Sequence, residues 1–288
     1  MIRKVFEIMI KDYTTVDAFW GIRRVQKIVE KDHYDCFPVI ENGEIVGILT
    51  RNDLITAHPN RIVLDAMSGR CKYIDENESV WSAKELFEDE SSQILIVTHG
   101  DEVTGVITKS AVDIEIGKHV DMLTGLYKSS YIIHKSQKLL DQGGEISIIF
   151  FDVNNFGYIN KKYGHTVGDN ILKEISKILK ECVPADTFLC RYGGDEFALL
   201  TGKCAEDCEV LAQSVLNRVR QHNFIGDISV GISAGIAGGK KRCNSRDGDM
   251  YKNITNLINL ASLASTKAKK EKENLVLGFS GTIDEMAI

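Results

Sequence analysis

The first half of the sequence repeats itself at a fixed interval, and this internal repeat is the strongest constraint on its fold. Residues 5–9 (VFEIM) resemble residues 63–67 (VLDAM), and residues 46–50 (VGILT) resemble residues 104–108 (TGVIT). Both pairs are 58 residues apart, since 67 − 9 = 58 and 108 − 50 = 58. Two copies of one small unit therefore make up this part of the chain.

Each copy predicts the same short series of elements. A helical stretch precedes an apolar run, at 37–40 and at 94–97, and a polar turn containing Gly, at 41–44 and 99–102, leads into a second strand. Two apolar runs joined by such a turn are typical of a strand pair. A single unit of this size is too small to bury its own faces, so we expect the two copies to pack together.

The repeat, the strand pairs and the pattern Gly-x-x-Thr-x-x-Asp at Gly47, Thr50 and Asp53 resemble a tandem pair of CBS domains. The resemblance covers residues 1–115 and implies that this Thr and Asp bind an adenosine nucleotide. Chemically, a hydroxyl and a carboxylate one helical turn apart could hold a ribose diol and a nearby phosphate. Alternatively, Asp53 only caps a helix that begins at Leu54.

The second copy departs from this pattern. It keeps Thr108 as a candidate nucleotide contact but has Ala111 where the acid would stand, so we expect at most one complete adenosyl site per chain. The junction at 113–120 contains no Pro and one Gly, which favours a short helix over a flexible tether. Such a connection would either transmit movement between the two halves or act only as a spacer.

The second half alternates helical and strand patterns around a hairpin. This order predicts an α/β (α+β) fold with a mixed central sheet, antiparallel in part and flanked by helices. The polar stretch 238–249 is expected to be a loop. The predicted helices cover 129–142, 169–182, 205–221 and 254–272, and the predicted strands cover 146–152, 188–192, 196–200, 228–237 and 274–277.

Three acidic residues stand at the ends of these strands. Asp152 closes an apolar strand, and Asp195 and Glu196 follow the Gly193-Gly194 turn of the hairpin. If the hairpin pairs beside the first strand, the carboxylates converge and repel one another unless a hard divalent cation lies among them. Magnesium held in this way is typical of phosphoryl or nucleotidyl transfer. Alternatively, these residues are a strand-end Asp and a solvated hairpin tip.

Four sequence blocks stand in order in the second half: 121–126 (DMLTGL), 151–169 with its FD, IN and GHTVGD segments, 191–197 (RYGGDEF) and a weakened last block at 261–274. Together they resemble the GGDEF family of diguanylate cyclases, which have a nucleotidyl-cyclase-like fold. The resemblance covers about residues 116–278, and we assign residues 116–288 to this second domain.

This resemblance implies that two GTP molecules condense into cyclic di-GMP, one held by each domain of a homodimer. Asp152, Glu196 and the carbonyl of Val153 would bind metal, and Asp195 would bind metal or help to deprotonate the 3′-hydroxyl. The cofactor would be Mg²⁺ or Mn²⁺, with two ions about 4 Å apart in each active site.

The resemblance also assigns residues to the nucleotide. Asn160 and Asp169 would recognise guanine, Lys269 would contact the β- or γ-phosphate, and Gly193 and Gly194 would belong to the GTP site. A carboxylate can accept from both N1–H and the N2 amine of guanine, which adenine cannot supply. Alternatively, Asp169 is the N-cap of a helix that starts at the next residue, and Lys269 is a solvated lysine.

Other family positions are expected to be structural or are altered. We expect an Asp121–Arg191 salt bridge and a structural His165. The product-inhibition motif Arg-x-x-Asp would fall at 184–187 (PADT), where neither end matches, so we expect no product-inhibition site there. The remaining departures are Asn154 and Gly157 for Asp and Lys, and Ser262, Thr266, Lys272 and Glu273 for Asp, Tyr, Gly and Arg.

Composition limits the class of protein. A charged fraction of 26% and a hydrophobic fraction of 43% exclude a disordered chain, and a net charge of −6 gives no reason to bind nucleic acid or an anionic membrane. No apolar run is long enough to span a membrane, and Glu7 and Lys11 interrupt any signal peptide. Seven cysteines without a CxxC pair favour reduced thiols, so we expect a cytoplasmic protein.

Two functions remain open at this point. One is a diguanylate cyclase that an adenosine nucleotide regulates through the CBS pair. The other is a catalytically weak or silent GTP-binding module that acts through partner proteins. Glu273 favours the second, because an acid near a triphosphate would repel it, and Gly157 removes a possible phosphate contact.

Overall fold

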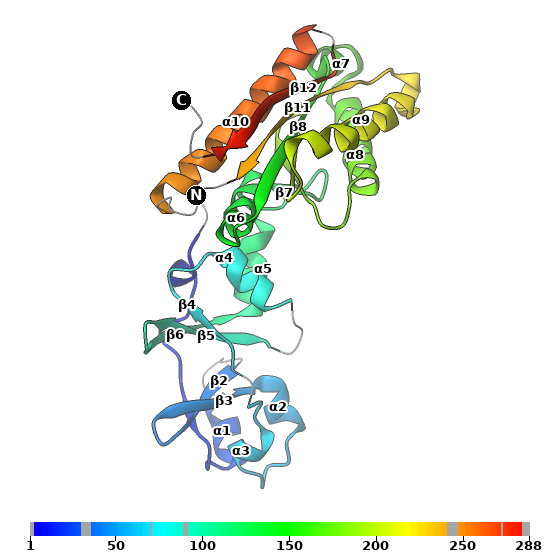
Figure 1. Ribbon diagram of the computed structural model, residues 1–288. Helices are drawn as coiled ribbons and strands as arrows, with labels where there is room; N and C mark the ends of the chain where they lie inside the picture. The colour runs from blue at the N-terminus through cyan, green and yellow to red at the C-terminus, as the bar shows by residue number, and fades with distance from the viewer. Residues whose placement is uncertain are drawn as a thin grey trace. The chain divides into compact units, whose positions relative to one another are not determined.

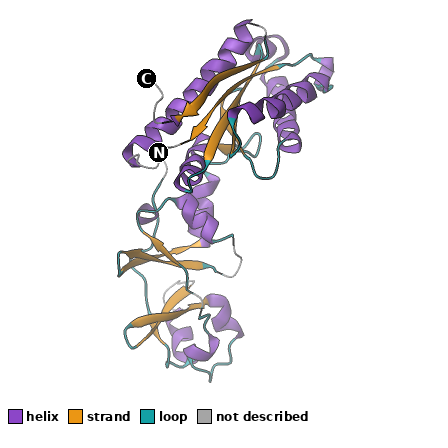
Figure 2. Cartoon of the chain, in the orientation of Figure 1, coloured by secondary structure: helices purple, strands orange, loops and turns teal. Residues whose placement is uncertain are grey.

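The computed structural model describes residues 3–29, 36–69, 71–88, 92–240, 247–271 and 273–283. The chain divides into two compact units, Met1–Lys118 and His119–Ile288. Figure 1 shows the elements of each unit along the chain, and Figure 2 shows that both contain helices and strands. Within the described residues, no helix is both long and apolar enough to cross a bilayer.

The first unit contains two three-stranded sheets, β1-β2-β3 and β4-β5-β6. Its elements recur at the interval of 58 residues that the sequence predicts: β2 begins at residue 36 and β5 at residue 94. The first copy contains η1 (Val5–Glu7), β1 (Val16–Asp17), α1 (Ile22–Val29), β2 (Cys36–Glu41), β3 (Glu44–Thr50) and α2 (Arg51–Thr56). The second contains α3 (Val63–Ala66), β4 (Tyr73–Asp75), α4 (Val80–Leu86), β5 (Ile94–His99), β6 (Glu102–Thr108) and α5 (Lys109–Gly117).

The two copies are interlocked, because the segment that opens each copy joins the sheet of the other. The backbone of Ile10 exchanges hydrogen bonds of 2.8 and 3.0 Å with Val106 in β6. Ser68 exchanges two bonds of 2.9 Å with Ile48 in β3. Ile48 also joins the buried cluster formed by residues of β5 and β6. The prediction that the copies pack together is confirmed.

Equivalent glycines permit this interlocking. A Cβ atom on Gly47 would lie 2.7 Å from the carbonyl oxygen of Ser68, and one on Gly105 would lie 2.8 Å from that of Ile10. Real Cβ atoms do not approach backbone oxygens so closely. Each glycine therefore stands where a segment of the other copy crosses its strand.

The second unit is built on one six-stranded sheet in the order β12-β11-β8-β10-β9-β7. The β8, β9, β10 and β11 pairings are antiparallel, whereas β7 and β12 pair in parallel with their neighbours, so the sheet is mixed as predicted. The strands are β7 (Tyr127–Lys128), β8 (Glu145–Val153), β9 (Phe188–Gly193), β10 (Glu196–Thr201), β11 (Ile232–Lys240) and β12 (Leu275–Thr282). The helices are α6 (Ser129–Asp141), α7 (Phe156–Tyr163), α8 (His165–Cys182), α9 (Ala205–Gln221), η2 (Ile225–Asp227) and α10 (Asp247–Glu271).

Helices cover both faces of this sheet, which explains the unbroken apolar sequence of β8. Its residues Ile149, Phe151 and Val153 pack with residues of α8 and α9. The alternate residues Ile148 and Phe150 pack with residues of α6 and α10. A strand buried on both sides lacks the alternation of a half-exposed strand. The first polar side chain in this run after Ser147 is therefore that of Asp152.

Several predicted boundaries were wrong. Helix α8 begins at His165 rather than 169, and helix α7 was not predicted at all. Gly164, at φ +89°, separates the two helices. Strand β11 begins at residue 232 rather than 228, and helix α5 ends at residue 117, short of the predicted 120.

The predicted loop at 238–249 was also wrong in part. Residues 238–240 continue β11, residues 241–246 lie outside the described residues, and α10 begins at residue 247 rather than 254. Gly238 and Gly239 were predicted to be loop residues. In the structure they lie in β11, where the lack of a side chain lets Ser147 approach Gly238 and Gly281 approach Gly239.

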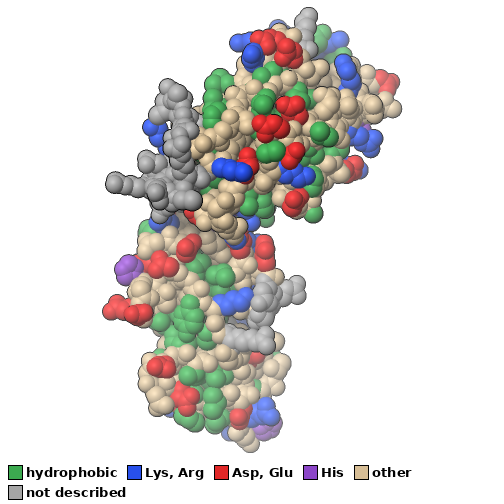
Figure 3. All heavy atoms as spheres, in the orientation of Figure 1, with side chains coloured by type: hydrophobic (Ala, Val, Ile, Leu, Met, Phe, Trp, Pro, Cys, Tyr) green, Lys and Arg blue, Asp and Glu red, His purple; other side chains and the backbone are tan. Residues whose placement is uncertain are grey.

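The surface of the second unit is mixed in charge. On the face visible in Figure 3, acidic and basic side chains lie among neutral and hydrophobic ones, without a continuous basic surface on that face.

The interlocked segments give a stability prediction. Gly105→Ala should lower the free energy of unfolding of the first unit by about 1–3 kcal/mol, because its Cβ would overlap the carbonyl of Ile10. Gly117→Ala is the matched control, since its Cβ would meet nothing within 4 Å. Urea unfolding followed by tryptophan fluorescence measures this unit, because both tryptophans, Trp20 and Trp81, belong to it. Equal midpoints for the two variants would contradict the prediction.

Candidate functional site

Two carboxylates face each other across neighbouring strands of the second unit. Asp152 in β8 lies directly opposite Glu196 in β10, and both side chains are half-buried. The next pair along the ladder, Phe151 and Phe197, is fully buried and fixes the register. Like charges placed directly opposite each other destabilise a sheet. The fold therefore holds an electrostatically unfavourable pair at the end of a rigid core.

A lysine from the last long helix compensates part of this charge. Lys269 in α10 donates from its Nζ to Asp152 Oδ1 at 2.7 Å and to the carbonyl oxygen of Val153 at 3.1 Å. These are two of the oxygens that the family resemblance assigns to a metal ion. The site thus presents a carboxylate and a carbonyl that already bind a cationic group.

The neighbouring acids remain under-compensated. Burial raises the pKa of Asp195 above its usual value, and the charge of Asp152 raises it further. Burial likewise raises the pKa of Glu196, with repulsion from Asp152 and Asp195 adding to the effect. Lys269 opposes both shifts without cancelling them. A further cation would reduce the electrostatic repulsion among these acids.

The donor set fits a hard divalent ion. Asp152 and Glu196 offer carboxylate oxygens and Val153 offers its carbonyl, which are ligands that Mg²⁺ and Mn²⁺ prefer when water and phosphate oxygens complete the shell. Within the ranges that the structure describes, no three His, Cys, Asp or Glu side chains are grouped closely enough to hold a metal by themselves. Asp152 and Glu196 form the facing pair. The backbone carbonyl of Asp195 accepts a hydrogen bond of 3.2 Å from the backbone N of Val153.

The Gly-Gly turn of the hairpin is held by one arginine. Gly194 has a left-handed φ of +49°, and its carbonyl accepts hydrogen bonds from Arg191 Nε at 2.9 Å and Nη2 at 2.6 Å. Arg191 Nη1 bonds both carboxylate oxygens of Asp121, at 2.9 and 3.1 Å. The predicted Asp121–Arg191 salt bridge is confirmed. Its role as a clamp on Gly194 was not predicted, since the sequence gives no sign of which carbonyl an arginine will reach.

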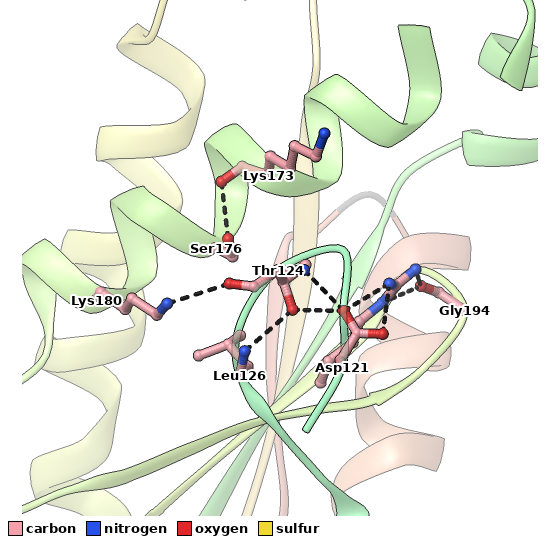
Figure 4. Close-up of polar contacts among 8 residues, drawn as sticks. Asp121, Thr124, Leu126, Lys173, Ser176, Lys180 and Gly194 are labelled. Carbon is pink, nitrogen blue, oxygen red and sulfur yellow. Dashed lines mark hydrogen bonds and ion pairs between the residues drawn. The ribbon is translucent and has the colours of Figure 1, made fainter. Parts of the chain in front are cut away.

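Asp121 is anchored in turn by its own loop. Its Oδ1 accepts from the backbone N of Thr124 at 2.9 Å and from the Thr124 hydroxyl at 2.7 Å, as Figure 4 shows. Partial burial alone would raise the pKa of Asp121, but these bonds and the pairing with Arg191 lower it below its usual value. Lys180 donates to the carbonyl of Thr124 at 3.2 Å and ties the loop to α8 (Figure 4). The turn that presents Asp195 and Glu196 is therefore fixed before any ligand binds.

The residues predicted to recognise guanine lie on two successive helices. Asn160 is in α7, and its Oδ1 is buried without a hydrogen-bond partner among the described atoms. This oxygen packs against Gly168, where any side chain would overlap it. Unpaired buried acceptors are rare in folded proteins. Asp169 is exposed in the second turn of α8, and the alternative interpretation of it as an N-cap was wrong.

The structure also places His165 and several positions at which the sequence departs from the family pattern. Asn154 Oδ1 accepts from the hydroxyl of Ser233 at 2.9 Å. Ser233 lies opposite Asp152 on β11, a neighbour that sequence reasoning missed because nothing local fixes the pairing of strands so far apart. Gly157 and Glu273 are exposed, and Lys272 lies outside the described residues. His165 is exposed in the first turn of α8.

The candidate nucleotide residues of the first unit form helix caps. Thr50 is the N-cap of α2: its hydroxyl accepts from the backbone N of Asp53 at 3.2 Å, and Asp53 Oδ2 accepts from the Thr50 backbone N at 2.8 Å. The hydroxyl also donates to Asp53 Oδ2 at 2.7 Å. The interpretation of Asp53 as the N-cap of a helix starting at Leu54 was wrong: Thr50 is the N-cap, the helix begins at Arg51, and Asp53 completes the capping box as its third residue. Thr108 caps α5 by accepting from the backbone N of Ala111 at 3.2 Å.

The segment at 184–187 forms a short turn. The carbonyl of Pro184 accepts from the Thr187 hydroxyl at 2.6 Å and from its backbone N at 3.2 Å.

Comparison with known proteins identifies both units. The sequence profile described as "Diguanylate cyclase, GGDEF domain" matches residues 118–275, and the "CBS domain" profile matches residues 5–60 and 63–115. Diguanylate cyclase DgcS of Shewanella oneidensis is 31% identical over 121 residues, covering 41% of each chain. Cyclic di-GMP phosphodiesterase PdeR of Escherichia coli is 29% identical over 155 residues, covering 51% of this chain and 23% of PdeR.

One of the solved structures aligns with part of this chain. The GGDEF domain of DgcB from Caulobacter crescentus, in complex with c-di-GMP, is 18% identical and aligns with a TM-score of 0.48 over 56% of this chain and 95% of that domain. The present chain spans less than half the length of the curated relatives named above. The GGDEF profile nevertheless covers more than half of the 288 residues and follows two CBS matches, so the chain belongs to the GGDEF family and carries a tandem CBS pair.

Proposed function

We propose that this protein is a diguanylate cyclase that condenses two GTP molecules into cyclic di-GMP. The observation that carries the proposal is the cross-strand pair of Asp152 and Glu196 beside Lys269, at the end of a rigid sheet. Asp195 and Glu196, whose pKa values are raised by burial and by neighbouring negative charge, lie near a cation-binding carbonyl, which suits the transfer of a nucleotidyl group, in which negative charge must be neutralised.

Asp152, Glu196 and the Val153 carbonyl would hold Mg²⁺ or Mn²⁺. The ion, of which the family resemblance implies two per site, would neutralise charge on the phosphate oxygens and lower the pKa of the attacking hydroxyl. Lys269 would contribute its ammonium group to the β- or γ-phosphate. It already lies within hydrogen-bond distance of Asp152, so a small side-chain movement suffices.

Asp195 suits a role in proton transfer. Burial and the charge of Asp152 raise its pKa, which makes the carboxylate a stronger base toward the 3′-hydroxyl than a solvated Asp. The clamp of Arg191 on Gly194 would hold the turn that carries it. Gly193 and Gly194 have no side chains, so a phosphate group can approach their backbone closely.

Asn160 and Asp169 would select guanine. The buried Oδ1 of Asn160 is an acceptor in need of a donor, and the exposed carboxylate of Asp169 can accept two parallel N–H bonds. Guanine offers such donors at N1 and N2, whereas adenine does not.

The CBS pair would regulate this activity by binding an adenosine nucleotide at Thr50 and Asp53, with Thr108 as the weaker counterpart. The cyclase would act as a homodimer, because each 3′-hydroxyl must reach the α-phosphate of a GTP held by another copy. The Thr50–Asp53 capping box places a hydroxyl and a carboxylate together at the strand-to-helix junction.

A GTP-binding module without turnover is the second candidate. Gly157 leaves open space where the family commonly has a lysine, and the exposed Glu273 places an acid where the family has an arginine. Both changes weaken attraction for a triphosphate. PdeR, part of which is similar to this chain, is named a cyclic di-GMP phosphodiesterase, so a similar sequence occurs in a protein named for another activity.

The cyclase proposal predicts a specific product. Incubation of the full chain with GTP and Mg²⁺ should give cyclic di-GMP, identified by chromatography and mass. Glu196→Gln should lower the rate by about 10²-fold or more, because it removes a metal ligand. Glu209→Gln, an exposed acid on α9, should leave the rate unchanged. GTP binding without product in the unaltered chain would favour the second candidate.

The same acids should lower the free energy of unfolding. The raised pKa of Asp195 means that the folded state disfavours its charged form, so Asp195→Asn should raise the melting temperature at pH 7.5 by on the order of 1–3 °C. The gain should shrink as the pH falls through the raised folded-state pKa and vanish only well below the ordinary Asp pKa of about 3.9, where the carboxyl is protonated in both states. Differential scanning calorimetry measures this, with Glu209→Gln as control. A lower melting temperature for Asp195→Asn at pH 7.5 would contradict the assignment.

Adenosine nucleotides should bind the first unit. Calorimetric titration of the full chain with AMP, ADP and ATP, without divalent metal, should show binding that Asp53→Ala weakens about tenfold or more. Asp65→Ala, at a nearby acid in α3, is the control. Binding that is equal in both variants would remove Asp53 from the proposed site.

A further inference from the structure

A polar pocket lies beside the candidate active site in the second unit, and none of the candidate metal or guanine ligands lines it. It has a volume of about 520 Å³, within the range of small-molecule sites. Its walls are α7, α9, the segment 228–232 that enters β11, and Asn274. Figure 1 shows α7 and α9 in the same unit.

The pocket has the chemistry of an anion site. The residues that line it include no Asp or Glu, and Arg220 from α9 supplies a positive charge. Within the described part of the chain, Arg220 makes no ion pair or hydrogen bond with another side chain, so its guanidinium is available. A planar guanidinium with five donors matches the oxygens of a phosphate group.

Amide side chains add directional hydrogen bonding. Gln213 and Asn217 face the pocket from successive turns of α9, with Gln213 Nε2 donating to Asn217 Oδ1 at 3.1 Å. Asn154 and Asn155 line it from the end of β8 and the start of α7. Groups that both donate and accept suit the edge of a heterocyclic base.

Two aromatic rings stand at the α7 wall. Tyr158 and Tyr163 are largely exposed, at 61% and 41% of their surface. The ammonium of Lys162 lies 5.7 and 4.9 Å from their ring centroids. Exposed rings held in this way offer flat surfaces against which a base can stack.

The pocket is separate from the predicted guanine site but adjoins the acidic pair. Asn160 and Asp169 do not line it. Asn154 does, and it follows Val153, whose carbonyl is a candidate metal ligand. The backbone N of Asn154 donates to Gly231 at 2.8 Å, and Gly231 also lines the pocket. A ligand bound here would contact Asn154 just after β8, two positions from Asp152.

We propose that this pocket binds a mononucleotide, with the phosphate on Arg220 and the base against the tyrosines and amides. Such a site can respond to a nucleotide without occupying the candidate active site. It does not depend on the cyclase activity, because the pocket and its lining exist whatever reaction the acidic pair performs.

The test is amide-shift mapping of the deuterated full chain by TROSY NMR, in EDTA so that metal-dependent binding is absent. GMP, AMP and inorganic phosphate are titrated separately to about 5 mM. At least one mononucleotide should shift the amides of 229–231 and of the 213–220 face saturably and more strongly than phosphate does. Because each site is mapped by position, binding at the first unit is not confused with binding here.

Arg220→Gln should weaken this binding about tenfold or more, since it removes a charge-assisted contact. Arg218→Gln is the matched control: it lies on the same helix and is exposed, but it does not line the pocket. Absence of shifts at these amides, equal affinity of phosphate and mononucleotides, or equal weakening by both substitutions would overturn the proposal. Asp195→Asn should retain the binding, which separates this outcome from failure of the cyclase.

Discussion

The register between β8 and β10 is the constraint on which the second unit depends. The same ladder that buries Phe151 against Phe197 brings Asp152 opposite Glu196. A shift by one residue would turn the apolar side chains of β8 to the wrong faces and separate the two acids. Because helices cover both sides of the sheet, neither face can tolerate that exchange. Core packing therefore sets the position of the candidate chemistry, although the two acids repel each other.

The site is stabilised from its periphery. Arg191 joins the carbonyl of Gly194 to Asp121, and Thr124 and Lys180 join that loop to α8. These bonds fix a turn whose left-handed glycine has few conformational restraints of its own. Lys269 compensates the acids from a different helix. Repulsion among the acids is thus opposed by contacts from three separate segments, which is how a folded chain keeps a poised group of like charges.

Much of this arrangement was predictable from local sequence. The apolar run before Asp152, the Gly-Gly turn and the repeat spacing all arise from short-range patterns. Contacts that depend on strand order were not predictable: Ser233 opposite Asp152, and Lys269 on Asp152, join residues far apart in the chain. Glycines that serve close packing rather than turns were predicted wrongly as loop residues, as at Gly238 and Gly239 in β11. Helix α7 and the first turn of α8 were not predicted, and Gly164, at φ +89°, separates these two helices.

The interlocking of the two CBS copies also affects how the first unit forms. Among the described residues, the far edge of β3 is bridged by Ser68, which belongs to the second copy, and β6 is bridged by Ile10 of the first. During synthesis the first copy therefore leaves the ribosome with an incomplete sheet and must wait for the second. The pair should fold as one cooperative element, since neither copy has a finished core alone.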